Sequence, residues 1–167
     1  YFAERPEPRL MDLLDIVALG TVADVAQLKG LNRAFVAQGL KVMSARRNVG
    51  LNALASAARL NRAPTCSDLG FALGPRINAG GRVGKSDLGV RLLTTADPEE
   101  ARLIAQELDR LNEERRAIEA QVQEAAEAAM ATQHNRAVAL VSGQGCHPGV
   151  IGIVAGRIKE KFGKPAI

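Results

Sequence analysis

The feature that most constrains the fold is a long stretch after Pro98 that contains no glycine or proline before Gly143. Asp97 can cap the amino end of a helix, and proline is well tolerated in the first helical turn. Apolar residues then recur at alternating spacings of three and four, which is the period of one helical face. The sequence therefore predicts one continuous helix from 98 to about 132, with an apolar stripe made of Ile104, Leu108, Leu111, Ile118, Val122, Ala125 and Ala129.

The length of this helix indicates how the chain is divided. At 1.5 Å per residue it spans roughly 50 Å, which is longer than a small domain is wide. We therefore expect it to connect two bodies, with parts at 1–96, 97–133 and 134–167. A coiled-coil dimer arm is the alternative, although Arg115 interrupts the apolar stripe.

Composition indicates how the first body is built. Apolar residues make up 47% of the 167-residue chain, but aromatic residues only 3%, which favours closely packed helices with an aliphatic core. One stretch, "LGPRINAGGRVG" at 73–84, has neither a helical nor a strand period, and we predict a loop there. Helices are expected around it, over 10–25, 32–45 and 49–60, and from Ser86 or Asp87 onward.

The residues after the long helix predict half of an α/β unit. Ala137–Val141 is expected to form a buried strand, and "SGQGCHPG" at 142–149 a glycine-rich turn. Val150–Phe162 is then predicted to be a helix that ends at Gly163, before a second strand from Pro165. The fold class expected for the whole chain is therefore α/β overall, and rich in helix.

The amino end of this last helix is a candidate phosphate site. A helix that follows a glycine-rich turn presents N–H groups and the positive end of its dipole. His147 stands just before the helix, and Arg157 lies two turns further along it. The alternative is a turn that is rich in glycine for steric reasons alone.

Positive charge is concentrated in one part of the chain. From Lys29 to Arg91 there are eleven basic and two acidic residues, a net charge of +9, whereas the rest of the chain carries −5. A phosphate backbone would be a suitable partner for such a region. The alternative is a solvated surface that is merely rich in arginine.

Several classes are disfavoured, and the ends suggest a fragment. No apolar run approaches the roughly 20 residues that span a bilayer, so no membrane role is expected. Cys66 and Cys146 show no pairing pattern, and no signal-peptide layout is present, which favours the cytoplasm. The chain opens without methionine and closes at "GKPAI", where a strand would begin, so we expect it to be part of a longer protein.

Three stretches resemble the RecJ-type single-stranded-DNA-specific exonucleases of the DHH phosphoesterase superfamily. They are "DIVALGTVADV", then "DLGFALGPRINAGGRVG" with the later "LDRLNEERR", and finally "GQGCHPGVIGIVAGRIKEKFGKPAI". The resemblance covers nearly the whole chain. It implies the end of a DHH domain, a long connecting helix and the start of a DHHA1 domain, with a two-metal active site in the cleft between the domains.

The resemblance also implies roles for particular residues. Asp24 matches the last metal-binding aspartate of the family, so it would be catalytic and would coordinate Mn²⁺ or Mg²⁺. The family's other metal motifs are absent from this sequence, so the chain alone should be inactive. The remaining implied positions would contact nucleic acid, with His147 also catalytic: Arg76, Asn78, Arg82, Gly145, His147 and Arg157.

As a whole protein, the expected function is metal-dependent 5′-to-3′ digestion of single-stranded DNA in repair and recombination. A helicase or a single-stranded-DNA-binding protein are further expected partners. Two alternatives stay open. A small-substrate DHH/DHHA1 phosphodiesterase, acting on cyclic dinucleotides or nanoRNA, would not need the basic span. A non-catalytic replication scaffold would not need Asp24 and His147.

Overall fold

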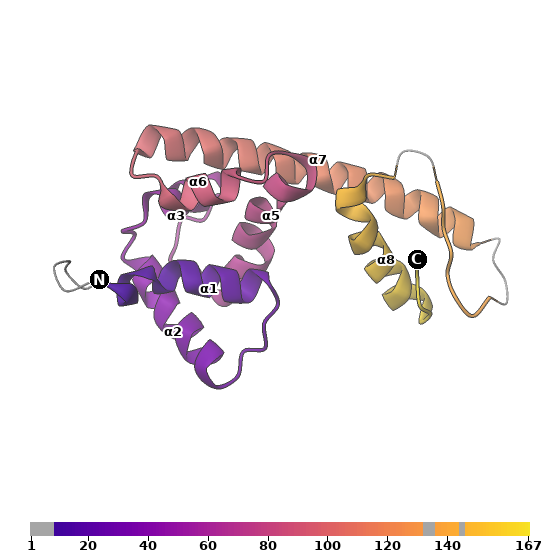
Figure 1. Cartoon of the computed structure of the whole chain (residues 1–167), viewed down its shortest axis with the longest axis horizontal. Coiled ribbons are helices and arrows are strands. Elements are labelled where there is room, and N and C mark those ends of the chain that lie inside the picture. Colours follow the sequence, from indigo (N-terminus) through magenta and orange to yellow (C-terminus); the bar gives the residue numbers. More distant parts are fainter. Residues whose placement is uncertain (1–8, 132–135, 144–145) are drawn as a thin grey trace, which may run out of the picture.

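The computed structural model describes residues 9–131, 136–143 and 146–167, and helices dominate these ranges. Residues before the long helix form a helical body, which lies on one side of that helix in Figure 1. In chain order the helical elements are η1 (Leu10–Leu13), α1 (Leu14–Ala23), α2 (Gly30–Ser44), α3 (Val49–Ala57), α4 (Cys66–Asp68), η2 (Leu69–Leu73), α5 (Gly74–Val83), α6 (Leu88–Thr94), α7 (Pro98–Met130) and α8 (Pro148–Phe162).

The long helix is confirmed, and it joins two hydrophobic cores. Helix α7 is continuous over 33 residues, and Asp97 caps it by accepting a 2.9 Å hydrogen bond from the Glu99 N–H. Near its start, Ile104 and Leu108 are buried with the helices of the first body. Near its end, Ala126 and Met130 belong to a second cluster with residues of the C-terminal segment. The first half of the predicted apolar stripe is buried, at Ile104, Leu108 and Leu111. Its second half is only partly covered, because Ile118, Val122 and Ala129 are half-buried and Ala125 is exposed. The boundaries at 96 and 133 stay a prediction.

Close helix crossings hold the first body together. Helix α1 packs across α2, and they meet at Gly39, where an added Cβ would lie 2.1 Å from the Leu14 carbonyl oxygen. Any larger residue would therefore force the two helices apart. Such contacts let a core of Ala, Leu and Val reach high packing density with few aromatic residues.

The predicted loop at 73–84 is wrong, because most of it is helix α5. Pro75 sits in the first turn, where its missing N–H costs nothing. The buried face consists mainly of Gly74, Ala79 and Gly80, and Gly80 lies against the Leu108 side chain. These small residues let α5 approach α7 closely, but they give no hydrophobic period. Tertiary packing therefore overrides a sequence whose glycines disfavour helix.

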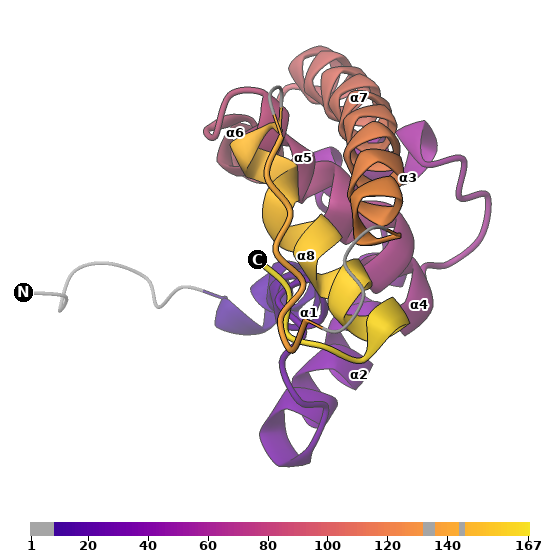
Figure 2. The same ribbon diagram turned by 90° about the vertical axis from the view of Figure 1, so that its right-hand side faces the viewer.

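The C-terminal part shows the expected pairing but not the expected strands. Ala139 and Ala166 form a parallel bridge, with the Ala139 N–H donating to the Pro165 carbonyl at 2.8 Å. In Figure 2 these two extended segments lie beside α8. Within the described ranges the pairing is limited to this isolated bridge, so the strand predicted at 137–141 is not formed as such. A pair of extended segments this short is only marginally stable unless further strands join it.

The last helix matches its prediction closely. Helix α8 begins two residues earlier than expected, at Pro148, and ends at Gly163, which has a φ of 63°. Glycine is the usual residue for this left-handed position after a helix. Over the described ranges, no helix is both long and apolar enough to cross a membrane.

Candidate nucleic-acid interface

Arginines from three helices converge on one hollow. The hollow has a volume of about 370 Å³ and lies where α5, α7 and α8 meet. Phe71, Asn78 and Asn112 also line it. We call it the arginine groove, after its five lining guanidinium groups: Arg76, Arg82, Arg115, Arg116 and Arg157.

Helix α5 contributes two of these arginines, which are held differently. The Arg76 Nε donates to Asp109 Oδ1 on α7 at 2.8 Å, and its Nη1 donates to the Ala72 carbonyl at 2.7 Å. Arg76 therefore forms an ion pair with an acid of the long helix. Arg82 instead donates from Nη1 to the Gly149 carbonyl at 2.9 Å, and it stays exposed.

Backbone contact places the start of α8 against the end of α5. An added Cβ at Gly149 would lie 2.3 Å from the Arg82 carbonyl oxygen. Only glycine permits this approach, because the obstructing atom belongs to rigid backbone. The two helices therefore meet at the edge of the arginine groove through backbone contact.

His147 caps α8 and occupies the donors that a phosphate would use. Its Nδ1 accepts a 3.0 Å hydrogen bond from the Gly149 N–H. The Val150 and Ile151 N–H groups donate to the His147 carbonyl, and Pro148 has no N–H. The first turn of α8 thus has no unused donor. Because Nδ1 accepts this hydrogen bond, the ring N–H of His147 is at Nε2. Gly145, also a predicted contact, lies outside the described residues.

Asp24 lies beside the arginine groove. It is exposed at the carboxyl end of α1 and lines a separate hollow of about 470 Å³ with Ala23 and Val25. Asn78 and Arg82 line both hollows, so the two spaces adjoin. The structure therefore brings together five of the predicted positions: Asp24 in one hollow, and Arg76, Asn78, Arg82 and Arg157 in or bordering the other.

The turn that follows Asp24 is strained. Val25 has a φ of 57°, and the Ala26 N–H donates to the Thr21 carbonyl at 3.1 Å. In helices that end with this hydrogen-bond pattern, the residue at the left-handed position is usually glycine. A β-branched residue there costs on the order of 1–3 kcal/mol. The strained turn directs the chain away from α1 directly after Asp24.

The chemistry of Asp24 suits a hard cation, but it is a single ligand. Carboxylate oxygens are the ligands that Mn²⁺ and Mg²⁺ prefer. Within the described ranges, no group of three or more His, Cys, Asp or Glu residues could hold a metal ion. Asp24 can therefore supply one ligand at most, and these residues support no catalytic step through a metal.

A buried carboxylate underlies the arginine groove. Glu119 is only 2% exposed, yet it forms ion pairs with Arg115 of its own helix and with Arg157 of α8. Arg115 also donates to Asn112 Oδ1 at 3.1 Å, and Arg157 donates to Gln123 Oε1 at 2.8 Å. Burial lowers the pKa of the Arg115 guanidinium, as do the positive charges of neighbouring arginines, while Glu119 opposes the shift.

Sequence reasoning missed this group. The apolar pattern marks Arg115 only as an interruption of the stripe. The available signal was its spacing, because Asn112, Arg115 and Glu119 follow one another at three and four residues on the same helical face. A polar patch between two apolar stretches of one face indicates a buried network.

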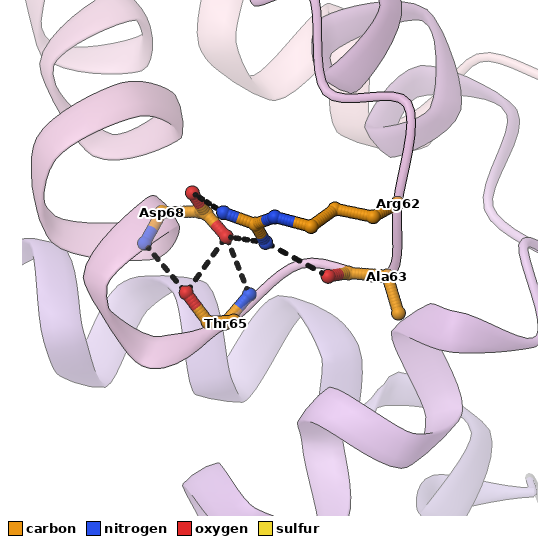
Figure 3. Close-up of polar contacts among 4 residues, drawn as sticks. All are labelled: Arg62, Ala63, Thr65 and Asp68. Carbon is orange, nitrogen blue, oxygen red and sulfur yellow. Dashed lines mark hydrogen bonds and ion pairs between the residues drawn. The ribbon is translucent and has the colours of Figure 1, made fainter.

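Other basic residues of the Lys29–Arg91 span are neutralised within the chain. Figure 3 shows Arg62 paired with Asp68 through two hydrogen bonds, of 2.5 and 3.0 Å. Thr65 and Asp68 form a reciprocal capping box at the start of α4. The Arg62 guanidinium holds the pKa of Asp68 well below its ordinary value. Arg47 and Arg91 also pair with acids, so the high charge of this span overstates what is available to a ligand.

No family model matches the chain, but individual proteins do. The single-stranded-DNA-specific exonuclease RecJ of Dickeya dadantii is 45% identical over 177 residues, covering 100% of this chain and 31% of that protein. The protein of the same name from Thermus thermophilus is 39% identical over 95% of this chain and 23% of its own length. This chain corresponds to a segment of the RecJ-type exonucleases.

Solved RecJ structures agree with this relationship. The crystal structure of RecJ from Thermus thermophilus in complex with Mn²⁺ superposes with a TM-score of 0.85 at 36% identity, over 95% of this chain and 24% of that one. A structure of exonuclease RecJ bound to manganese gives 0.86 at 35% identity, over 99% and 42%. The RecJ-type fold therefore extends over the helical body, α7 and α8. The chain spans less than a third of the length of these curated relatives.

Proposed function

We propose that this chain is the strand-gripping part of a metal-dependent exonuclease that acts on single-stranded DNA. The observation that carries the proposal is the convergence of five arginines on one hollow that adjoins Asp24. The names of the RecJ relatives support the substrate and the reaction. Crystal structures of RecJ with Mn²⁺ and with Mg²⁺ support the cofactor.

The arginine groove has the groups that a single strand requires. Guanidinium groups bind phosphate oxygens through fixed, forked hydrogen bonds. Among the described residues, Arg116 is exposed and has no ion pair, and the one hydrogen bond of the Arg82 side chain goes to a carbonyl. Arg76 keeps its Nη2 without a hydrogen bond to the described residues. Asn78 and Asn112 add neutral polar groups.

Asp24 and His147 would act at the end of the strand nearest the metals. Asp24 would supply one oxygen ligand to a metal site completed by the rest of the protein, and the metals would activate water and stabilise the leaving oxygen. His147 would donate from Nε2 to a substrate phosphate while Nδ1 keeps the cap of α8. Arg157 would line the same path, and Gly145 stays a proposed contact of the strand.

The wider biological role remains a prediction. This predicted role includes digestion from 5′ to 3′, participation in repair and recombination, and a cytoplasmic location. It also includes a helicase or a single-stranded-DNA-binding protein as a partner. No observation favours a small-substrate phosphodiesterase or a replication scaffold, because the relatives are named exonucleases.

Titration of a labelled oligonucleotide into the full-length protein at several salt concentrations tests the proposal. Each arginine–phosphate interaction removed from a single strand should reduce the slope of log K against log salt by about 0.7. We expect this reduction for Arg82→Ala, with affinity reduced and the melting temperature nearly unchanged. Arg76→Ala should also lower the melting temperature, because it leaves Asp109 unpaired.

Arg102→Ala is the matched control. Arg102 is exposed like Arg82, but it lies on α7 and pairs with Glu99 away from the arginine groove. Its removal should leave the salt slope as in the wild type. An unchanged slope for Arg82→Ala in a folded protein would refute the proposed function.

A further inference from the structure

We infer that Glu119 is a positioning residue for the arginine groove. Its buried carboxylate holds Arg115 of α7 and Arg157 of α8 in fixed orientations, so that both helices present their cations to one DNA strand. The inference rests on the proposed function, because it assumes that the groove binds DNA.

The contacts of Glu119 define its place. It is 2% exposed, and its two carboxylate oxygens pair with different arginines, Oε2 with Arg115 and Oε1 with Arg157. Each arginine has one further anchor, Asn112 for Arg115 and Gln123 for Arg157. Both guanidinium groups are therefore held at two points while they line the groove.

Electrostatics explains why a buried carboxylate is needed there. Arg82, Arg116 and Arg157 all lie close enough to Arg115 to disfavour its charge. Without a compensating anion, these like charges would repel one another and the long side chains would turn toward solvent. One buried charge between two arginines keeps the cluster together, while its burial leaves the groove surface positive. Arginines ordered in advance lose less entropy when a strand binds.

A second ion pair shows that Glu119 does more than join two helices. Glu127 of α7 pairs with Lys161 of α8 at 2.7 Å, one to two turns further along both helices. Neither residue lines the arginine groove. Among the described residues, the contacts of Glu119 and Gln123 hold the groove arginine Arg157, whereas the Glu127–Lys161 pair holds no groove arginine. This makes Glu127→Gln a matched control for Glu119→Gln.

The test is a double-mutant cycle in the full-length enzyme, with single-stranded oligonucleotide as the probe. Glu119→Gln keeps the size of the side chain and removes its charge. We expect it to weaken DNA binding by about tenfold, within the range of couplings between contacting residues. KM for single-stranded DNA should rise more than kcat falls. Glu127→Gln should leave both values near those of the wild type.

The cycle separates positioning from general destabilisation. If Glu119 acts largely through Arg157, the loss caused by Glu119→Gln should shrink severalfold in an Arg157→Ala background. An equal loss in both backgrounds, or wild-type affinity for folded Glu119→Gln, would overturn the inference.

Arg157→Lys serves if Glu119→Gln does not fold. It keeps a positive charge but loses the fork that contacts Glu119 and Gln123 together. We expect weaker binding at an unchanged melting temperature, and wild-type affinity would overturn the inference. Either result is distinct from failure of the proposed function, which would appear as an unchanged salt slope for Arg82→Ala.

Discussion

At the scale of single residues, the groove contains an aromatic side chain that is unusually exposed. Phe71 is 86% exposed, although phenylalanine usually lies inside a protein. It lies in the wide π-type turn η2 and lines the groove beside Arg76. Such turns occur often at functional sites. An exposed ring beside arginines suits the face of an unpaired base.

The first prediction concerns this ring. Stacking of a base on an aromatic side chain contributes about 1–3 kcal/mol, so Phe71→Ala should weaken single-stranded DNA binding by roughly fivefold to 150-fold. The salt slope should stay the same, because every arginine–phosphate interaction is kept. Phe71→Tyr should retain affinity. Fluorescence titrations at two salt concentrations give both quantities.

Phe162→Ala is the control for this change, since Phe162 is also partly exposed but lies at the end of α8, outside the groove. If Phe71→Ala instead lowers the melting temperature and leaves affinity intact, Phe71 serves packing in the full-length protein.

At the scale of elements, the consecutive helices α4, η2 and α5 supply half of the residues that line the groove. An ion pair between Arg62 and Asp68 holds the beginning of this segment in place. The loop before it is closed by Arg62 and Asp68, and the Thr65 N–H donates to Asp68 Oδ2 at 2.7 Å. Asp68 is almost fully buried. A carboxylate that accepts several hydrogen bonds and forms an ion pair gives the folded state its full stabilisation only while it is ionised.

This gives a prediction about pH. The pKa of Asp68 is lowered in the folded state. Its contribution to the free energy of unfolding is therefore fully present at pH values above the pKa of an aspartate in the unfolded chain, near 4. The contribution shrinks as pH falls below that value toward the folded pKa. Asp68→Asn should therefore be less stable than the wild type at pH 7, and the difference should narrow by pH 3.

Urea unfolding at both pH values measures this difference in the free energy of unfolding. Asp87→Asn is a suitable comparison, because Asp87 is exposed and its only ion pair among the described residues is long, at 3.9 Å. A difference for Asp68→Asn that stays constant with pH would contradict the assignment.

At the scale of the whole molecule, one helix connects two hydrophobic cores and one groove. The first core contacts the start of α7, the second contacts its end, and the polar cluster around Glu119 lies between them. The groove needs α5 and α8 at fixed positions along α7. Its shape therefore depends on the rigidity of the helix in this middle segment.

The prediction at this scale is a break in the helix. Ala117 is exposed on α7 between the two cores. Ala117→Pro should cost about 3 kcal/mol or more, because proline removes a hydrogen bond and clashes with the preceding turn. It should also weaken DNA binding. Ala117→Gly, which costs about 1 kcal/mol, should leave binding nearly intact. Circular dichroism melting and oligonucleotide titration test both, and equal binding by the two variants would contradict a rigid spacer.

How much the sequence predicted differs among the elements. Helices α7 and α8 were predicted with ends accurate to about two residues, because periodic apolar residues and caps act locally. Helix α5 was missed, because its buried face is made of glycine and alanine that only the contact with α7 makes favourable. The strand at 137–141 was overpredicted, since a strand needs partners as well as apolar residues.

The candidate site divides in the same way. The sequence alone determined which cations were present, and the local apolar period and caps determined the long helix after Pro98. The helix predicted over 10–25 was too long at its carboxyl end, because α1 ends at Ala23 and Asp24 follows it. Tertiary structure decided which arginines pair with acids and which remain for a ligand. Arg62 and Asp68 are near in sequence, but Arg76 meets Asp109, and Arg157 meets Glu119, only after the helices pack. Charge acts through space, so its partners are fixed by the fold.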